Sequence, residues 1–231
     1  MTSFTNKLIP GIFIKRYKRF LADIQLENGE VITAHCANSG SMKTCIKEGW
    51  KVYLSHHDNP KRKLAYTLEL IDNGKCLICL NTHKANGIVK TAIENNLISE
   101  LRGYTNIRPE VPYGSKSRID LLLESDDSPP CFVEVKTVTL LGDNENYQFP
   151  DAVTTRGQKH LKDLMAEKEK GNRAVLFFLI QRSDGKAFEA AKDIDPEYAE
   201  LLEKAKNKGV EVLTYLSDIS INKIKMGSAL A

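Results

Sequence analysis

The sequence predicts an α/β (α+β) protein of two domains, a small five-stranded β-barrel in residues 1–82 followed by a mixed sheet flanked by helices in residues 83–231. Two observations lead to this prediction: strand-like runs separated by turns fill the first part, and helical and strand patterns alternate afterwards. A third observation is that net charge differs in sign between the two parts. With 231 residues, 42% of them hydrophobic, the chain can build packed cores and is not a disordered tail protein.

Strand and turn signals alternate in the first part. Asn28-Gly29 and Asn73-Gly74 are typical turn dipeptides between β-prone runs. The expected strands cover residues 11–26, 31–36, 51–55, 64–71 and 75–80. Five strands at this spacing can close into a barrel of the oligonucleotide-binding (OB) kind, whose exposed face and loops often contact nucleic acid.

The pattern changes after residue 83. Apolar residues at helical spacing predict a helix from about Ile88 to Leu97, and Thr154 is expected to cap a second helix that ends at Gly171. A third helix is expected from Pro196 to about Lys208. Strands are expected over residues 107–111, 118–123, 131–140, 174–180 and 210–216, and loose order over 221–231. This element order predicts a mixed sheet flanked by helices.

The formal net charge of +3 averages two unequal parts. Residues 1–90 carry 14 Lys/Arg and 7 Asp/Glu, a balance of +7, whereas residues 91–231 have a balance of −4. A basic first part is suited to a polyanion such as nucleic acid, while the second part gathers carboxylates. Uneven but solvated surface charge is the alternative interpretation.

Composition also bears on the compartment. No apolar run approaches the roughly 18 to 20 residues of a membrane span, and the positive cluster near the N-terminus follows the apolar residues, unlike a secretory signal. We therefore expect a cytoplasmic protein that has no membrane partner, with five free thiols. Cys76 and Cys79 should lie on opposite faces of a strand, although a zinc site that also uses Cys36 and Cys45 stays open.

Chemistry is predicted at two strands that share a short, turn-rich connection. If they pair as an antiparallel hairpin, Asp120 and Glu134 meet on one face together with Lys136. Two carboxylates and the backbone carbonyl of Val135 can hold Mg²⁺ (or Mn²⁺) beside a phosphodiester, and Lys136 can orient water or stabilise charge. The alternative is an amphipathic hairpin with an ordinary surface ion pair.

With these residues in place, the chain resembles PD-(D/E)xK nuclease-like proteins, although Ile119 stands where the name has proline. It is also similar, over nearly its whole length, to the sugar fermentation stimulation protein A (SfsA) family. The matching segments are residues 35–42, 61–63, 117–120, 134–136 and 149–161. The resemblance implies an OB-like barrel joined to a nuclease-like domain, non-specific DNA binding, and a regulatory role in sugar (maltose) metabolism.

Two more residues are candidates for catalysis. Glu94 lies on the expected helix before the strands, where nuclease-like folds often place another acid, and Gln158 precedes Leu161 on the same helix face. An exposed helix residue and a glutamine bordering the core are the respective alternatives.

Other residues are candidates for contact with DNA. The loop 38–41 offers backbone amides and small side chains to a phosphate, and basic side chains interleave with rings as single-strand binding requires. The predicted nucleic-acid contacts are His35, Asn38, Ser39, Ser41, Lys61, Arg62, Lys63, Arg118, Arg156 and Lys159. Ordinary turns and solvated charge are the alternatives.

The sequence therefore supports two hypotheses. The first is a Mg²⁺-dependent nuclease acting on DNA, possible substrates being single-stranded or branched DNA, or RNA. The second is a DNA-binding regulator that keeps the nuclease-like fold only as a scaffold.

Overall fold

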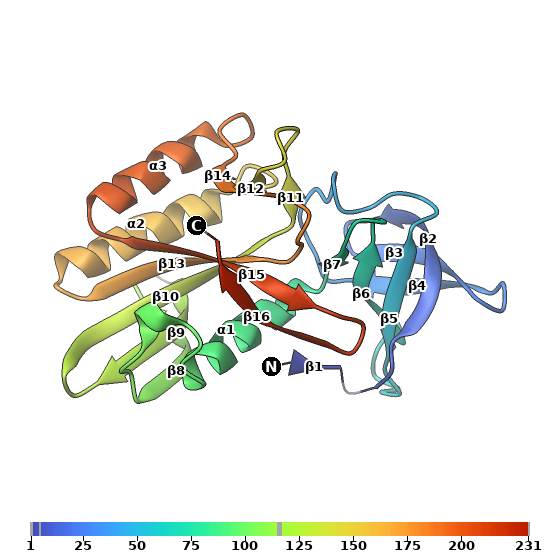
Figure 1. Cartoon of the computed structure of the whole chain (residues 1–231), viewed down its shortest axis with the longest axis horizontal. Helices are drawn as coiled ribbons and strands as arrows, with labels where there is room; N and C mark the ends of the chain where they lie inside the picture. Colours follow the sequence, from blue (N-terminus) through green and yellow to red (C-terminus); the bar gives the residue numbers. More distant parts are fainter. Residues whose placement is uncertain (1, 5, 115–116, 231) are drawn as a thin grey trace.

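The computed structural model describes residues 2–4, 6–114 and 117–230. Figure 1 shows a small β-barrel on one side and a larger domain on the other, in which helices cover a twisted sheet. Among the described residues, no helix is long and apolar enough to cross a membrane.

Five strands close the barrel. They follow the order β4-β3-β2-β5-β6, and β4 pairs with β6 in parallel to complete the ring. The elements are β2 (Ile9–Tyr17), β3 (Leu21–Leu26), β4 (Val31–Cys36), β5 (Lys51–His56), β6 (Tyr66–Asp72) and the short β7 (Leu77–Cys79) beside β6. Alternate side chains such as Ala22, Ile24, Val52 and Leu54 are fully buried inside the ring. The predicted five-stranded OB-like barrel is confirmed.

Two of the predicted barrel strands differ from the structure in their bounds and in their place in the barrel. Residues 11–26 are a hairpin, because Lys18 and Arg19 adopt left-handed φ values of 46° and 62° and reverse the chain between β2 and β3. Residues 75–80 form only β7, an addition to the ring rather than its fifth strand. The count of five was right because these two errors offset each other.

A seven-stranded mixed sheet forms the second domain. Its order is β1-β16-β15-β13-β10-β9-β8, with β10, β13 and β15 parallel and the other neighbours antiparallel. The strands are β1 (Thr2–Ser3), β8 (Asn106–Tyr113), β9 (Ser117–Ser125), β10 (Ser128–Val138), β13 (Arg173–Ile180), β15 (Glu211–Ile219) and β16 (Lys223–Ala229). The apolar run of β13 reflects its central place, since helices cover both faces of the sheet there.

Three helices pack on this sheet. α1 (Ala85–Glu94) buries its apolar side against one face, and α2 (Thr155–Glu169) and α3 (Pro196–Asn207) cover the other (Figure 1). Thr154 caps α2 as predicted, its Oγ1 accepting a hydrogen bond from the backbone of Gly157 at 3.0 Å. Two short 3₁₀ turns cover Thr82–Lys84 and Ser99–Leu101.

The ends of the chain differ from expectation. Residues 221–231 were expected to be loose, but β16 pairs with β15 and β1, because Ile224 and Met226 alternate inward into the core. β1 lies within the segment assigned to the barrel yet pairs in the larger sheet. A further small sheet, not foreseen, joins β11 (Leu140–Leu141), β12 (Tyr147–Phe149) and β14 (Phe188–Ala190).

A polar network joins the two domains. The guanidinium of Arg182 contacts both carboxylate oxygens of Asp184, at 2.6 and 2.8 Å, and donates to the carbonyls of Thr44 in the barrel domain and Thr139. Asn73 donates to Asp184 at 2.7 Å from the barrel side. These contacts fix the barrel against the end of the sheet where β10 leads into β11.

Candidate active site

The β9–β10 hairpin places Asp120 and Glu134 side by side. Leu121 pairs with Val133 in this antiparallel ladder, and the next step of the register sets Asp120 opposite Glu134 on the same face. The backbone N–H of Val135 donates to Asp120 Oδ2 at 2.8 Å. The predicted hairpin is thus confirmed.

Glu134 is buried and only partly satisfied. Its side chain is 2% exposed, and Oε1 contacts both Lys136 Nζ at 2.6 Å and His160 Nδ1. Lys136 Nζ lies 3.1 Å from His160 Nδ1, because both groups converge on the same carboxylate oxygen, so α2 supplies a side chain that helps to hold Glu134 in place. The second carboxylate oxygen, Oε2, is buried without a hydrogen-bond partner among the described residues. A buried acceptor of this kind has unused capacity for a ligand.

Asp120 is held by α1, whereas Glu134 is held by α2. Asn86, in the first turn of α1, donates from Nδ2 to Asp120 Oδ1 at 2.8 Å. Burial and the negative charge of Glu134 raise the pKa of Asp120 above its ordinary value. For Glu134, burial opposes ionisation, but hydrogen bonds and charge from His160 and Lys136 outweigh it and lower the pKa. The two carboxylates therefore differ in how readily they ionise.

These donors fit a hard divalent cation. Asp120, Glu134 and the carbonyl of Val135 offer oxygen atoms only, which Mg²⁺ and Mn²⁺ prefer, and the free Oε2 is the clearest vacant acceptor. No cluster of three or more His, Cys, Asp or Glu able to hold a metal occurs in the described part of the chain. Such a site would therefore need water to complete its coordination, which Mg²⁺ commonly retains.

Three predicted residues lie apart from this centre. Glu94 is exposed at the far end of α1 from Asn86, and it pairs with Lys90. The amide nitrogen of Gln158 contacts the carboxylate of Asp195 at 3.0 and 3.3 Å, which places this group at the start of α3. Arg118 donates to the carbonyl of Glu110 on β8. The structure does not bring these groups to the carboxylate pair.

A cavity between the two domains opens next to the carboxylate pair, where Val135 and Lys136 of β10 line it. It has a volume of about 450 Å³. Its lining includes Asn86, Val135, Lys136 and Arg156 from the larger domain, and Arg19, Asn38, Ser39 and Gly40 from the barrel domain. The predicted contact residues Asn38, Ser39 and Arg156 thus meet at one cavity with the hairpin.

The other predicted contacts with DNA are spread around this region. Lys159 is engaged by Asp163 and Ser117, and Ser41 carries a buried hydroxyl without a partner in the described residues. Lys61, Arg62 and Lys63 are exposed on the loop between β5 and β6. His35 lies at the end of β4, where burial and the nearby His83 and Arg62 side chains lower its pKa.

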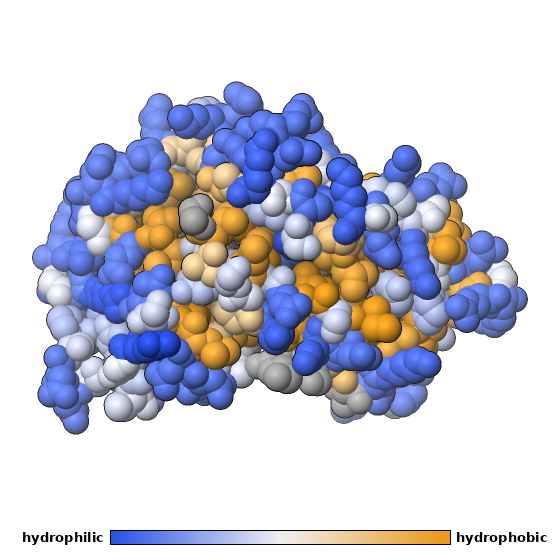
Figure 2. All heavy atoms as spheres, in the orientation of Figure 1, coloured by the Kyte–Doolittle hydropathy of each residue, from blue (hydrophilic) through white to orange (hydrophobic). Residues whose placement is uncertain are grey.

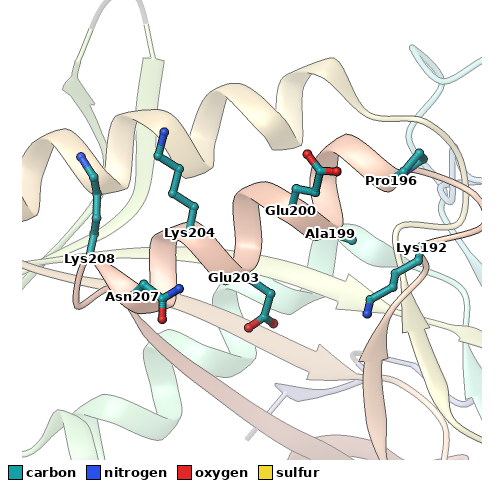
Figure 3. A pocket seen from close by; sticks show the side chains of 8 residues that line it. All are labelled: Lys192, Pro196, Ala199, Glu200, Glu203, Lys204, Asn207 and Lys208. Atoms are coloured by element: carbon teal, nitrogen blue, oxygen red, sulfur yellow. The ribbon is translucent and has the colours of Figure 1, made fainter.

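A larger cavity, of about 650 Å³, lies over α3. Figure 3 shows that its charged side chains splay apart, with Glu200, Lys204 and Lys208 on one side of the helix and Glu203 on the other. Ligand sites normally have a few convergent polar groups, which this surface lacks. We therefore place the candidate site at the smaller cavity beside the hairpin.

The cysteines are distributed over different cores. Cys79 packs in the core shared with α1, whereas Cys76 lies against the barrel core that contains Cys36 and Cys45. Cys76, directly before β7, and Cys79, at its end, thus face opposite sides of the sheet, as alternation predicts. The zinc alternative gains no support from the described residues, where no metal-binding cluster is found.

Comparison with known families decides the classification. The family described as "Sugar fermentation stimulation protein RE domain" matches residues 83–223, and "SfsA N-terminal OB domain" matches residues 14–80. The chain belongs to the sugar fermentation stimulation protein family. A sugar fermentation stimulation protein homolog of Geotalea uraniireducens (strain Rf4) is 52% identical over 97% of this chain and 96% of its own. That of Shewanella pealeana (strain ATCC 700345 / ANG-SQ1) is 53% identical over 94% and 93%.

The fold is shared with a solved member of the family. The structure of Pyrococcus furiosus SfsA in complex with Ca²⁺ superposes with a TM-score of 0.89, at 27% identity, covering 100% of this chain and 98% of that one. The predicted fold class, an OB-like barrel followed by a nuclease-like mixed sheet flanked by helices, is confirmed.

Two residues that contact the carboxylate pair were not predicted from sequence. Neither Asn86 nor His160 carried a motif signal that linked it to Asp120 or Glu134. Asn86 lies 34 positions before Asp120, and His160 follows Glu134 by 26. Helical spacing does place His160 one turn after Arg156 on α2, and Arg156 Nε lies 3.4 Å from His160 Nε2.

Proposed function

We propose that this protein is a divalent-metal-dependent nuclease that cleaves DNA and whose active site contains Asp120, Glu134 and Lys136. The observation that carries the proposal is Glu134 Oε2, which lies buried opposite Asp120 and has no hydrogen-bond partner among the described residues, with Lys136 2.6 Å from the other oxygen. The Ca²⁺ bound by the Pyrococcus furiosus relative supports a divalent-cation site in the family. The +7 balance of residues 1–90 supports a polyanionic substrate.

The side chains have separate roles in this proposal. Asp120, Glu134 and the Val135 carbonyl would hold Mg²⁺ or Mn²⁺, which activates water and neutralises charge on the phosphodiester when bound. Asn86 orients Asp120, and His160 orients Glu134. The Lys136 ammonium lines the cavity and provides N–H donors for a phosphate oxygen or for the attacking water.

The reaction is a hydrolysis. The oxygen of a water molecule forms a bond to phosphorus, the bond from phosphorus to the leaving sugar oxygen breaks, and that oxygen takes up a proton. Arg156 lies at the cavity wall, where a guanidinium can bind a neighbouring phosphate and fix the strand for in-line attack.

A cleavage assay tests the proposal. Labelled single-stranded, duplex and branched DNA, and RNA, are incubated with Mg²⁺ or Mn²⁺ and the wild type, Asp120→Ala or Lys136→Ala. We expect the wild type to cleave DNA and both variants to lose at least about a hundredfold in rate. Asp126→Ala, at an exposed position in the same hairpin, should cleave like the wild type.

Metal binding gives an independent readout. Mg²⁺ or Mn²⁺ should raise the melting temperature of the wild type and of Asp126→Ala, because a ligand that binds only the folded state stabilises it. Asp120→Ala should lose this shift. Cleavage that survives both site substitutions would refute the catalytic assignment. Absence of cleavage of every substrate would favour the alternative, a DNA-binding regulator without turnover.

A further inference from the structure

An exposed ring lies on the barrel turn nearest the cavity. Phe20 follows the left-handed residues Lys18 and Arg19 between β2 and β3, and its side chain is 42% exposed. It stacks against His35 at the end of β4, with ring centroids 6.4 Å apart and planes 18° apart. An aromatic side chain left this open at a loop of an OB-like barrel is available to a further ring.

Two arginines lie close to this pair of rings. The guanidinium of Arg19 lies 5.8 Å from the centre of the Phe20 ring. Arg62, from the loop between β5 and β6, donates to Thr67 at 2.8 Å, and Thr67 is the β6 partner of His35 in the barrel. Burial, together with the neighbouring His83 and Arg62 side chains, lowers the pKa of His35, which disfavours the charged form of its ring. Phe20, His35, Arg19 and Arg62 are called here the barrel patch.

The barrel patch is physically tied to the interdomain cavity. Arg16 donates to the carbonyls of Arg19 and Asn38, at 2.8 and 2.9 Å, and Arg19 donates to the carbonyl of Ser39 at 3.2 Å. These bonds fix the β2–β3 turn against the loop that forms the barrel side of the cavity. Arg19 belongs to both, since it also lines the cavity together with Lys136 on the opposite wall.

We propose that the barrel patch holds one nucleotide of single-stranded DNA, its base stacked on Phe20 and His35 and its phosphates on Arg19 and Arg62, while the strand continues into the cavity. The inference rests on the proposed nuclease function and adds the substrate class, a single strand or a splayed strand end.

Two physical arguments favour a single strand over a duplex. Stacking on a side chain requires an exposed base face, and in a double helix these faces are already stacked on one another. The cavity of about 450 Å³ is also in the range of small-ligand pockets, which suits one or two nucleotides rather than a double helix.

Binding measured without metal tests the inference separately from cleavage. Fluorescence anisotropy in EDTA compares a labelled single strand of about 12 nucleotides with a duplex of equal length. We expect Phe20→Ala to weaken single-strand binding about 10- to 100-fold and duplex binding less than about threefold. Phe20→Trp, which keeps a stacking face, should bind like the wild type.

Controls separate the patch from general effects. Val31→Ala removes another exposed apolar side chain of the barrel, 57% exposed on β4, and should bind both probes unchanged. Asp120→Ala should keep single-strand binding while losing cleavage. If the wild type cleaves nothing yet Phe20→Ala still loses single-strand binding, the nuclease proposal fails and the patch stands.

Cross-linking keeps the inference testable even if Phe20→Ala folds poorly. A single strand with photoreactive iodouracil bases, irradiated with the wild-type protein, should attach to the peptide that contains Phe20 or His35. Three outcomes would each overturn the proposal. Phe20→Ala could bind a single strand as tightly as the wild type does, it could lose affinity equally for the single strand and the duplex, or the cross-links could be confined to other peptides.

Discussion

Two groups of buried charged side chains in this protein are built differently. At the domain interface, Arg182 and Asp184 are 2% and 4% exposed, and the carboxylate is bound on both oxygens by Arg182 and Asn73. At the hairpin, Glu134 is 2% exposed as well, yet one of its oxygens has no partner in the described structure.

The difference shows how buried charge can serve two purposes. A fully paired network has no capacity left for a ligand, and removing one member leaves its partner buried and uncompensated. An incompletely paired carboxylate beside a cavity retains that capacity. The first group joins the domains, and the second is the one at which we propose metal binding and catalysis.

The largest expected effect concerns the interface pair. Asp184→Asn should lower the free energy of unfolding by about 3 to 5 kcal/mol, because it leaves the Arg182 guanidinium buried without its counter-charge. Urea denaturation followed by fluorescence measures this. Asp193→Asn, at an exposed position, should change it by less than about 0.5 kcal/mol. A similar small change for Asp184→Asn would remove the distinction between the two groups.

A substitution of Gln158 tests whether this residue has a structural role, like the interface pair, or a catalytic role, like the hairpin carboxylates. Gln158→Met should lower the free energy of unfolding by about 1 to 2 kcal/mol, since Asp195 loses a buried hydrogen-bond donor. Gln25→Met, at an exposed position on β3, serves as the control. A fully folded Gln158→Met protein that loses tenfold or more in cleavage rate would instead support the predicted catalytic role of this glutamine.

A smaller effect of opposite sign is expected at the hairpin. Burial and Glu134 raise the pKa of Asp120, so its ionisation at neutral pH costs stability. The free energy of unfolding of Asp120→Asn should therefore equal that of the wild type or exceed it by up to about 1 kcal/mol, which thermal melting measures, while cleavage is lost. A clear destabilisation at neutral pH would show that the charge of Asp120 supports the fold.

The two aspartates should also respond oppositely to pH. The advantage of Asp120→Asn should shrink as pH falls through the raised pKa of Asp120. Asp184 has a lowered pKa, because its Arg182 partner outweighs the cost of burial. The stability it contributes is present above the unfolded value of about 4 and is lost as pH falls below it. Thermal melts of each variant and the wild type between neutral and acidic pH measure both trends.

The smallest effect is expected from exposed charge on the barrel. Replacing Lys61, Arg62 and Lys63 by glutamine should weaken DNA binding and reduce the slope of log affinity against log salt by about 0.7 to 0.9 for each lost phosphate contact. The matched control replaces three exposed lysines of the α3 region, Lys204, Lys206 and Lys208, and should leave the slope unchanged. An unchanged slope for the first triple would refute the barrel contact.

Local patterns in the sequence were enough to predict most of the central strands, the cap of α2 and the carboxylate pair. Alternation along a strand placed Asp120 and Glu134 on one face of a hairpin, and Thr154 marked the start of α2, because such signals depend on geometry within a few residues. The end of the chain was misjudged, since β16 is stabilised by pairing with β15 and β1 rather than by a strong pattern of its own.

The environment of the carboxylates was decided only by the tertiary structure. Whether Glu134 is a surface ion pair or a buried, half-satisfied group depends on α2 bringing His160 across it and on α1 bringing Asn86 to Asp120. The cavity likewise depends on how the two domains pack, where Arg182 contacts Asp184 and the carbonyl of Thr44. Sequence alone determines which side chains share a strand face, whereas burial and partners depend on how distant elements pack, which no local period encodes.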